Sequence, residues 1–167
     1  MLAVLWAVLL LAGVEAGSAE AKEPAFVGSE RCGVCHTKEL ANWRGSHHDL
    51  AWTHPGDGHL LAPFTGETFP HKGVAHRFYR EGDRLRVSTD GPDGKQTDYD
   101  IKGVVGIAPL QQYLVETRAG RLQALDTAWD AQKKRWYHLY PDQDLPSSNG
   151  LHWSGPYKSW NARCCGT

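Results

Sequence analysis

The stretch Arg84-Leu85-Arg86-Val87-Ser88 decides the fold class of the middle of this 167-residue chain. Its polar and apolar residues alternate, and this alternation is typical of a strand with one buried and one solvated face. Turn-forming residues flank it on both sides, Glu81-Gly82-Asp83 before it and Asp90-Gly91-Pro92-Asp93-Gly94 after it. The stretch therefore predicts a strand between two tight turns.

The same pattern continues towards the C-terminus. Residues 111–117, 121–128 and 135–140 have the composition of further strands, and the short polar segments 118–120 and 130–133 connect them. Because sequential strands joined by short turns pair with their neighbours, the sequence predicts an antiparallel β meander over residues 74–140.

A second informative stretch, Cys32-Gly33-Val34-Cys35-His36, lies upstream of the meander. Cys-x-x-Cys-His is the attachment signature of c-type haem, because two thiols one turn apart can each add to a vinyl group while the adjacent His ligates the iron. The pair of cysteines leaves three other readings open. They are a thioredoxin-like redox site, a disulfide, and structural zinc with two more ligands from Cys164, Cys165 or a His.

The segment around this motif favours helix. Ser29 is a plausible N-cap before the cysteines, residues 38–43 are good helix formers, and Gly45 predicts a break or bend. Prolines then mark residues 55–70 as an irregular connector. We therefore expect an α+β fold in which a haem-binding helical and loop segment (22–60) precedes the β meander (74–140), with irregular loops between them.

The N-terminus resembles a secretory signal peptide. Residues 2–14 form an apolar run, and small residues follow, with plausible cleavage after Ala16, Ala19 or Ala21. No Lys or Arg precedes the run, so an uncleaved anchor or a start further upstream stays open. The prediction is a signal peptide over 1–21 and one exported, periplasmic domain over 22–167 without a membrane span.

Composition narrows the function classes. The chain has 18 basic and 19 acidic residues, a balance that gives nucleic-acid binding no support. Met1 is the only methionine, so a chain that has lost its signal peptide cannot use the Met/His iron ligation of many small cytochromes c. The sixth iron ligand is then a His, a water or something weaker.

His47 and His48 are the candidate axial ligands, because they follow the haem motif on the same segment. In one continuous helix, the Cα atoms of His36 and His48 would lie roughly 18 Å apart. Ligands on opposite faces of one haem need roughly 12 Å. Either the chain folds back near Gly45, or His48 serves a second haem.

The run from Cys32 to His36, followed by Trp43-x-x-Ser46-x-His48, resembles the multihaem c-type cytochromes of the cytochrome c-552/c-554 family. The later runs Leu110-Gln111-Gln112-Tyr113-Leu114 and Trp136-Tyr137-His138-Leu139-Tyr140 resemble one branch of it, in which tetratricopeptide repeats often follow. The resemblance implies thioether bonds at Cys32 and Cys35, His36 as proximal ligand and His48 as axial ligand, with His47 as its rival. His138 and His152 also resemble family positions, without an assigned role.

The chain departs from this branch at its end. A second Cys-x-x-Cys-His motif is expected after Trp160-Asn161, but Cys164 is followed directly by Cys165 and no His follows. Residues 151–167 therefore look like the truncated start of a second haem segment, in a truncated, frame-shifted or partial member of the family.

These observations predict an electron carrier with one complete haem c site, whose partner is a redox protein or a neighbouring haem domain. Three alternatives stay open. They are part of a multihaem enzyme acting on nitrogen oxides or hydroxylamine, a ligand-binding module with five-coordinate iron, and a product of a disrupted gene. Because a single complete motif cannot relay electrons between haems, catalysis by this chain alone is the weaker expectation.

Overall fold

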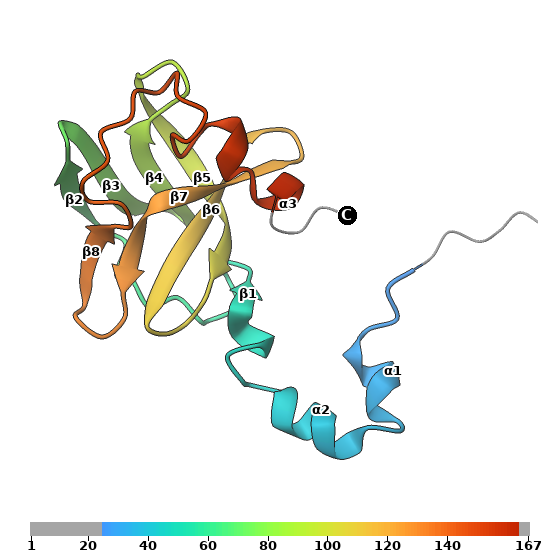
Figure 1. The fold of residues 1–167 in the computed structure, drawn as a ribbon. Coiled ribbons are helices and arrows are strands. Elements are labelled where there is room, and N and C mark those ends of the chain that lie inside the picture. The colour runs from blue at the N-terminus through green and yellow to red at the C-terminus, as the bar shows by residue number, and fades with distance from the viewer. Residues whose placement is uncertain (1–24, 164–167) are drawn as a thin grey trace, which may run out of the picture.

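The structure, a computed structural model, describes residues 25–163, so the predicted signal peptide and Cys164 and Cys165 lie outside the described residues. Its main feature is an antiparallel sheet that curls into a nearly closed barrel (Figure 1). Seven strands follow one another in chain order: β2 (Thr65–His71), β3 (Val74–Glu81), β4 (Arg84–Asp90), β5 (Gln96–Val105), β6 (Leu110–Arg118), β7 (Arg121–Asp130) and β8 (Arg135–His138). The short strand β1 (Trp52–Thr53) pairs with β5.

Helices contribute little to the described chain. They are α1 (Ser29–Gly33), α2 (Thr37–Trp43) and α3 (Trp160–Arg163), with short 3₁₀ turns η1 (Asp49–Ala51) and η2 (Pro156–Lys158). The prediction of an α+β fold built on a helical haem-binding segment is therefore wrong, since the protein is mostly antiparallel β structure. The predicted cap at Ser29 is also wrong, because Gly28 is the N-cap and no side chain caps α1.

The sheet is larger than the predicted meander. Its first long strand, β2, begins at Thr65 in the proline-containing stretch that was predicted to be an irregular connector. Pro70 is tolerated there because β2 is an edge strand of the ladder, where a missing N–H breaks no central pairing. β5 was also missed, because its first half, Gln96 to Asp100, is largely polar.

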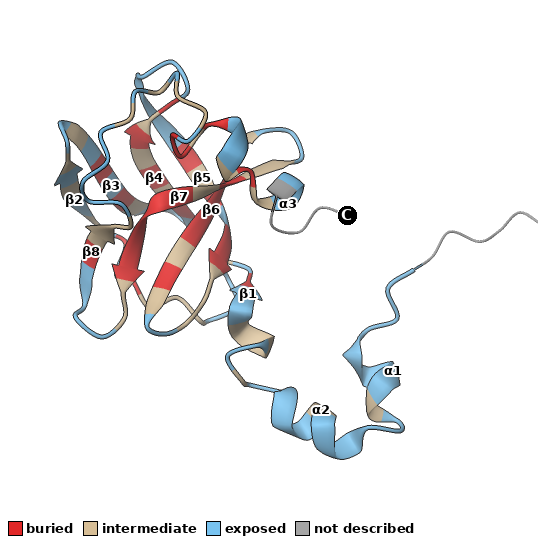
Figure 2. Ribbon diagram, viewed as in Figure 1, coloured by how far each residue is buried: buried red, intermediate tan, exposed pale blue. Residues whose placement is uncertain are grey.

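Aromatic side chains fill the barrel. Figure 2 shows that buried residues are concentrated in the strands of the barrel. Phe64, Phe78, Tyr113 and Trp136 are all buried and form one cluster of ring contacts. The Phe78 and Trp136 rings stack with centroids 3.6 Å apart. Because each buried aromatic removes a large apolar area from water, this cluster is a main source of the free energy that holds the barrel together.

Two glutamines of the Leu110–Leu114 run hold neighbouring segments in place. Gln111 is fully buried, and its amide donates to the carbonyl oxygens of His59 and Gly106 while its Oε1 accepts from the Leu61 N–H. The Gln112 amide donates to the Leu125 carbonyl on β7 at 2.6 Å. The stretch on which the family resemblance partly rests therefore has a structural role in the barrel.

Two rings close the barrel between its edge strands, β2 and β8. No β-ladder joins these two strands in the described chain. Instead, the imidazole of His71 at the end of β2 stacks on that of His138 at the end of β8, with centroids 3.9 Å apart and the planes 8° from parallel. We call this contact, together with His76, Asp90 and His152, which line the same pocket, the histidine seam.

Candidate functional site

The predicted haem motif lies on the arm, residues 25–51, which extends away from the barrel (Figure 1). Cys32 and Cys35 fall in one helical turn, because the His36 N–H donates to the Cys32 carbonyl at 2.9 Å and the Cys35 N–H donates to it at 3.2 Å. Within residues 25–163 neither thiol forms a disulfide, both are exposed, and His36 is the N-cap of α2. The three side chains are therefore adjacent and open to a large planar group.

The arm buries none of its side chains. Neither α1 nor α2 has a buried residue, and Figure 2 shows the arm as exposed along almost its whole length. Apolar side chains stand in solvent there: Val34 is 80% exposed, Phe26 and Val27 are exposed, and Trp43 is 40% exposed. These uncovered apolar side chains are available to contact a bound group.

His47 and His48 follow a break in the helix, as the bend at Gly45 predicted. α2 ends at Trp43, and Gly45 has a φ of +70°, which glycine adopts without steric cost. The Gly45 N–H donates to Asp49 Oδ2 at 2.8 Å, and this bond fixes the turn. Because the helix ends before them, the distance objection that assumed one continuous helix from His36 to His48 no longer applies. Both histidines are exposed, and axial ligation by either stays a prediction.

The residues of the arm fit haem c. Two exposed thiols on one turn, an exposed imidazole directly after them and uncovered apolar side chains supply the covalent, axial and van der Waals contacts that such a group needs. A preformed zinc site is not seen, because no three His, Cys, Asp or Glu side chains within residues 25–163 are grouped to hold a metal ion.

A second cluster of titratable side chains lies at the histidine seam, around a pocket of about 60 Å³. His71 and His138 form its stacked wall, and His76 from β3 lies beside them, 6% exposed. The Nδ1 atom of His76 lies 2.9 Å from the Thr89 hydroxyl. The pocket has room for solvent-sized molecules only and is smaller than organic ligand sites.

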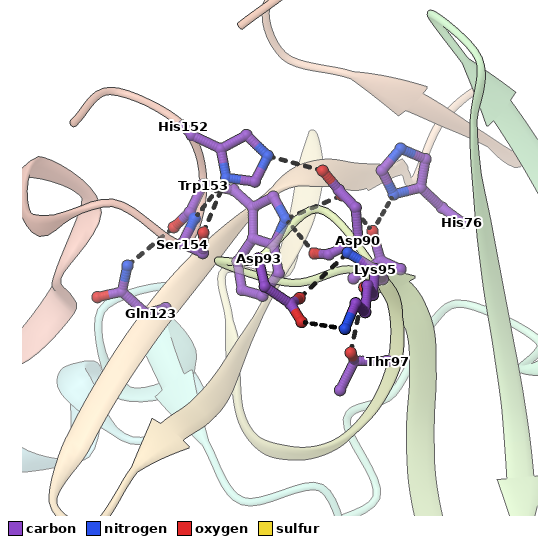
Figure 3. A network of polar contacts seen from close by, with 10 residues as sticks. His76, Asp90, Asp93, Lys95, Thr97, Gln123, His152, Trp153 and Ser154 are labelled. Carbon is purple, nitrogen blue, oxygen red and sulfur yellow. Dashed lines mark hydrogen bonds and ion pairs between the residues drawn. The ribbon is translucent and has the colours of Figure 1, made fainter. Parts of the chain in front are cut away.

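Asp90 at the end of β4 connects this cluster to the C-terminal loop (Figure 3). Its Oδ2 accepts a hydrogen bond from His152 Nε2 at 2.8 Å, and its main-chain oxygen and Oδ1 accept from the Trp153 indole at 3.1 and 3.2 Å. His152 Nδ1 in turn lies 2.8 Å from the Ser154 hydroxyl. Since Ser154 does not line the pocket, this Asp–His–Ser chain holds the loop on the barrel and does not present a nucleophile to the cavity.

Two imidazoles of this cluster, His76 and His138, have lowered pKa values. Burial, reinforced by the neighbouring His138, His71 and His152, lowers the pKa of His76 to about 4, although Asp90 opposes the shift. Burial and the facing His71 also lower the pKa of His138. Burial alone would raise the pKa of Asp90, but hydrogen bonds and the charge of His152 lower it overall.

Sequence reasoning missed the histidine seam as a cluster. His71, His76 and Asp90 received no role, while His138 and His152 were noted only by resemblance. These residues come from β2, β3, β4, β8 and the C-terminal loop, and no local motif links them. Only closure of the barrel brings them together.

Comparison with protein families, with characterised proteins and with solved structures finds no match to this chain. Within residues 25–163, no helix has the length and apolar character needed to cross a bilayer.

Proposed function

We propose that this chain is an exported, periplasmic c-type haem protein that transfers electrons. The observation that carries the proposal is the helical turn in which Cys32, Cys35 and His36 are adjacent and exposed, with no competing side-chain partner among residues 25–163. The proposal covers one haem c on this arm, while a second haem would need the segment after α3.

The roles of the arm residues follow from their chemistry. The Cys32 and Cys35 thiols would hold haem c covalently, each by addition across one vinyl group, in which the thiol hydrogen goes to the neighbouring vinyl carbon and no external oxidant is needed. The His36 imidazole, together with His48 or His47, would ligate its iron. Haem c supplies one-electron chemistry at its iron.

Several features of the arm suit electron transfer better than catalysis. An iron with two imidazole ligands has no open position, so it exchanges electrons and does not bind a substrate. The arm stands clear of the barrel (Figure 1), which leaves the cofactor accessible to a redox partner or to a neighbouring haem domain. The barrel then acts as a scaffold that carries the arm.

The first test is the mass of the full chain after secretion into a bacterial periplasm that has a c-type haem maturation system. The wild type is expected to gain the mass of one haem, resistant to extraction with acid and acetone. The double variant Cys32→Ser/Cys35→Ser loses it, whereas the matched control Cys164→Ser/Cys165→Ser keeps it. A wild type without covalent haem would overturn the proposal, and bound zinc or a disulfide would then explain the cysteines.

The second test asks about the axial ligand, by electron paramagnetic resonance of the ferric protein. A low-spin bis-imidazole signal is expected for the wild type. His48→Ala is expected to convert it to high spin, while His47→Ala leaves it unchanged; the reverse result would assign the ligand to His47. A high-spin wild type would contradict electron transfer and favour the five-coordinate or catalytic alternatives.

A further inference from the structure

The tip of the β6–β7 hairpin carries two arginines in an unfavourable arrangement. Arg118 and Arg121 are direct cross-strand partners, and like charges placed opposite each other destabilise a sheet. Neither forms an ion pair with a carboxylate of the described chain. Arg118 is exposed, and its guanidinium has no hydrogen-bond partner among residues 25–163. An anion between the two guanidinium groups would remove this repulsion.

Both arginines line a cleft of about 580 Å³ between the hairpin tip and the segment 156–162. This volume falls within the range of small-molecule sites and is about ten times that of the pocket at the histidine seam. The other lining residues are small, apolar or polar: Ala119, Gly120, Pro156, Ser159, Asn161 and Ala162. No carboxylate of residues 25–163 lines the cleft.

The walls of the cleft are fixed by hydrogen bonds. The Asn161 amide donates to the Gly120 carbonyl at 2.6 Å, and its Oδ1 accepts from the Leu122 N–H, so α3 is held beside the hairpin (Figure 1). Arg121 donates to Gln123 Oε1 at 3.0 Å and to the Gly155 carbonyl at 3.3 Å, which orients its guanidinium. A preorganised wall lowers the entropic cost of binding.

Two other charged side chains near the cleft have partners of their own. The Glu116 carboxylate, on the same hairpin, keeps its negative charge but is turned to the loop backbone, where it accepts the Gly120 N–H at 2.8 Å. Lys158 forms an ion pair with Asp126 at 3.0 Å. The Ser159 hydroxyl is a buried polar group of the cleft wall that has no partner within the described chain. Among the described residues that line the cleft, the two arginines are the charged ones, and both are positive.

We propose that this cleft binds a small organic anion through a carboxylate or phosphate group held between Arg118 and Arg121. The planar guanidinium groups match the paired oxygens of either anion. Ala119, Pro156 and Ala162 contact the body of the ligand, because they supply the apolar part of the lining. This site does not depend on haem at the arm.

The test is isothermal titration calorimetry of the full chain at low ionic strength, with phenyl phosphate and benzoate as probes. The wild type is expected to bind at least one of them, with a dissociation constant of about 1 mM or below. Arg118→Gln is expected to weaken binding about tenfold or more, and Arg118→Lys to restore only part of it, because an ammonium lacks the guanidinium fork. The matched control is Arg80→Gln on β3, an exposed arginine far from the cleft lining, and it should bind like the wild type.

The two probes separate the ligand classes. Binding of phenyl phosphate alone identifies a phosphate-ester site, binding of benzoate alone identifies a carboxylate site, and binding of both identifies an anion site without selection; each supports the proposal. Absence of binding by the wild type at millimolar concentration overturns it, as does equal binding by the wild type and Arg118→Gln. In the absence of ligand, Arg118→Gln should unfold at the same temperature as the wild type or at a higher one, because the substitution removes the repulsion between Arg118 and Arg121. A lower unfolding temperature would show that Arg118 has a stabilising partner and would contradict the reasoning.

Discussion

Acidification should destabilise the barrel at the histidine seam, and His76 is the group that decides how strongly. Its imidazole is buried, 6% exposed, and burial lowers its pKa from the ordinary 6.5 to about 4. The folded protein therefore keeps His76 neutral at pH values where the unfolded chain has already bound a proton. Between pH 6.5 and 4 the unfolded state binds more protons, so stability falls as the pH falls.

The size of the loss follows from this difference in pKa. One pKa unit corresponds to about 1.4 kcal/mol, so His76 should lower the free energy of unfolding by about 1 kcal/mol at pH 5.5 and by about 3 kcal/mol at pH 4.5, relative to pH 8. His138, whose pKa is also lowered, adds to the loss in the same direction. Asp90 adds nothing in this window, because its contribution is lost only below its ordinary pKa of 3.8.

The assay is urea unfolding followed by tryptophan fluorescence at several pH values from 8 to 4.5. Trp129 and Trp136, which are buried near the seam, report opening of the barrel. His76→Gln keeps a polar side chain towards Thr89 but cannot titrate, so its curve against pH should be flatter by about 3 kcal/mol at pH 4.5. His47→Gln removes an exposed imidazole of the arm and should leave the wild-type slope. An unfolding free energy that is flat between pH 6.5 and 4.5 in the wild type, or equally steep in His76→Gln, would refute this reasoning.

Three further variants test the barrel by chemical denaturation. Trp136→Ala removes a buried ring of the aromatic cluster and should cost about 3–5 kcal/mol of unfolding free energy; a loss below 1 kcal/mol would contradict its place in the core. Gly106→Ala should cost about 1–3 kcal/mol of unfolding free energy, because the φ of Gly106 is +78° and the new Cβ would lie 2.9 Å from the Leu110 carbonyl oxygen. Gly56 has open space around it, so the unfolding free energy of Gly56→Ala should stay near that of the wild type. Gln123 donates to the carbonyl groups of Trp153 and Gly155 in the C-terminal loop, so Gln123→Leu should cost about 1–3 kcal/mol of unfolding free energy. Gln132 is exposed, so Gln132→Leu should be nearly neutral. Equal effects of the two substitutions would contradict a stabilising role of the Gln123 hydrogen bonds.

The sequence predicted parts of the fold with local signals. The alternation in Arg84–Ser88 and the turns on either side of it correspond to β4 and its connections, and the segments 111–117 and 121–128 lie within β6 and β7. The predicted α+β class is nevertheless wrong, because the helix formers around Cys32–His36 build only the short helices α1 and α2, while most of the described chain is antiparallel sheet. β2 and β5 carry weak local patterns, and their strand form depends on pairing with neighbours.

The local sequence determined the turn that carries the proposed haem motif, because neighbouring residues alone set the spacing of Cys32, Cys35 and His36. The bend at Gly45 is local in the same sense. The histidine seam and the arginine cleft were decided only by the tertiary structure. Their members lie up to 81 residues apart, as His71 and His152 do, and they meet because β2 and β8 approach each other and the C-terminal loop folds back on the barrel. Local patterns report which residues a turn or a strand brings together, whereas contacts across the barrel depend on packing of the whole sheet.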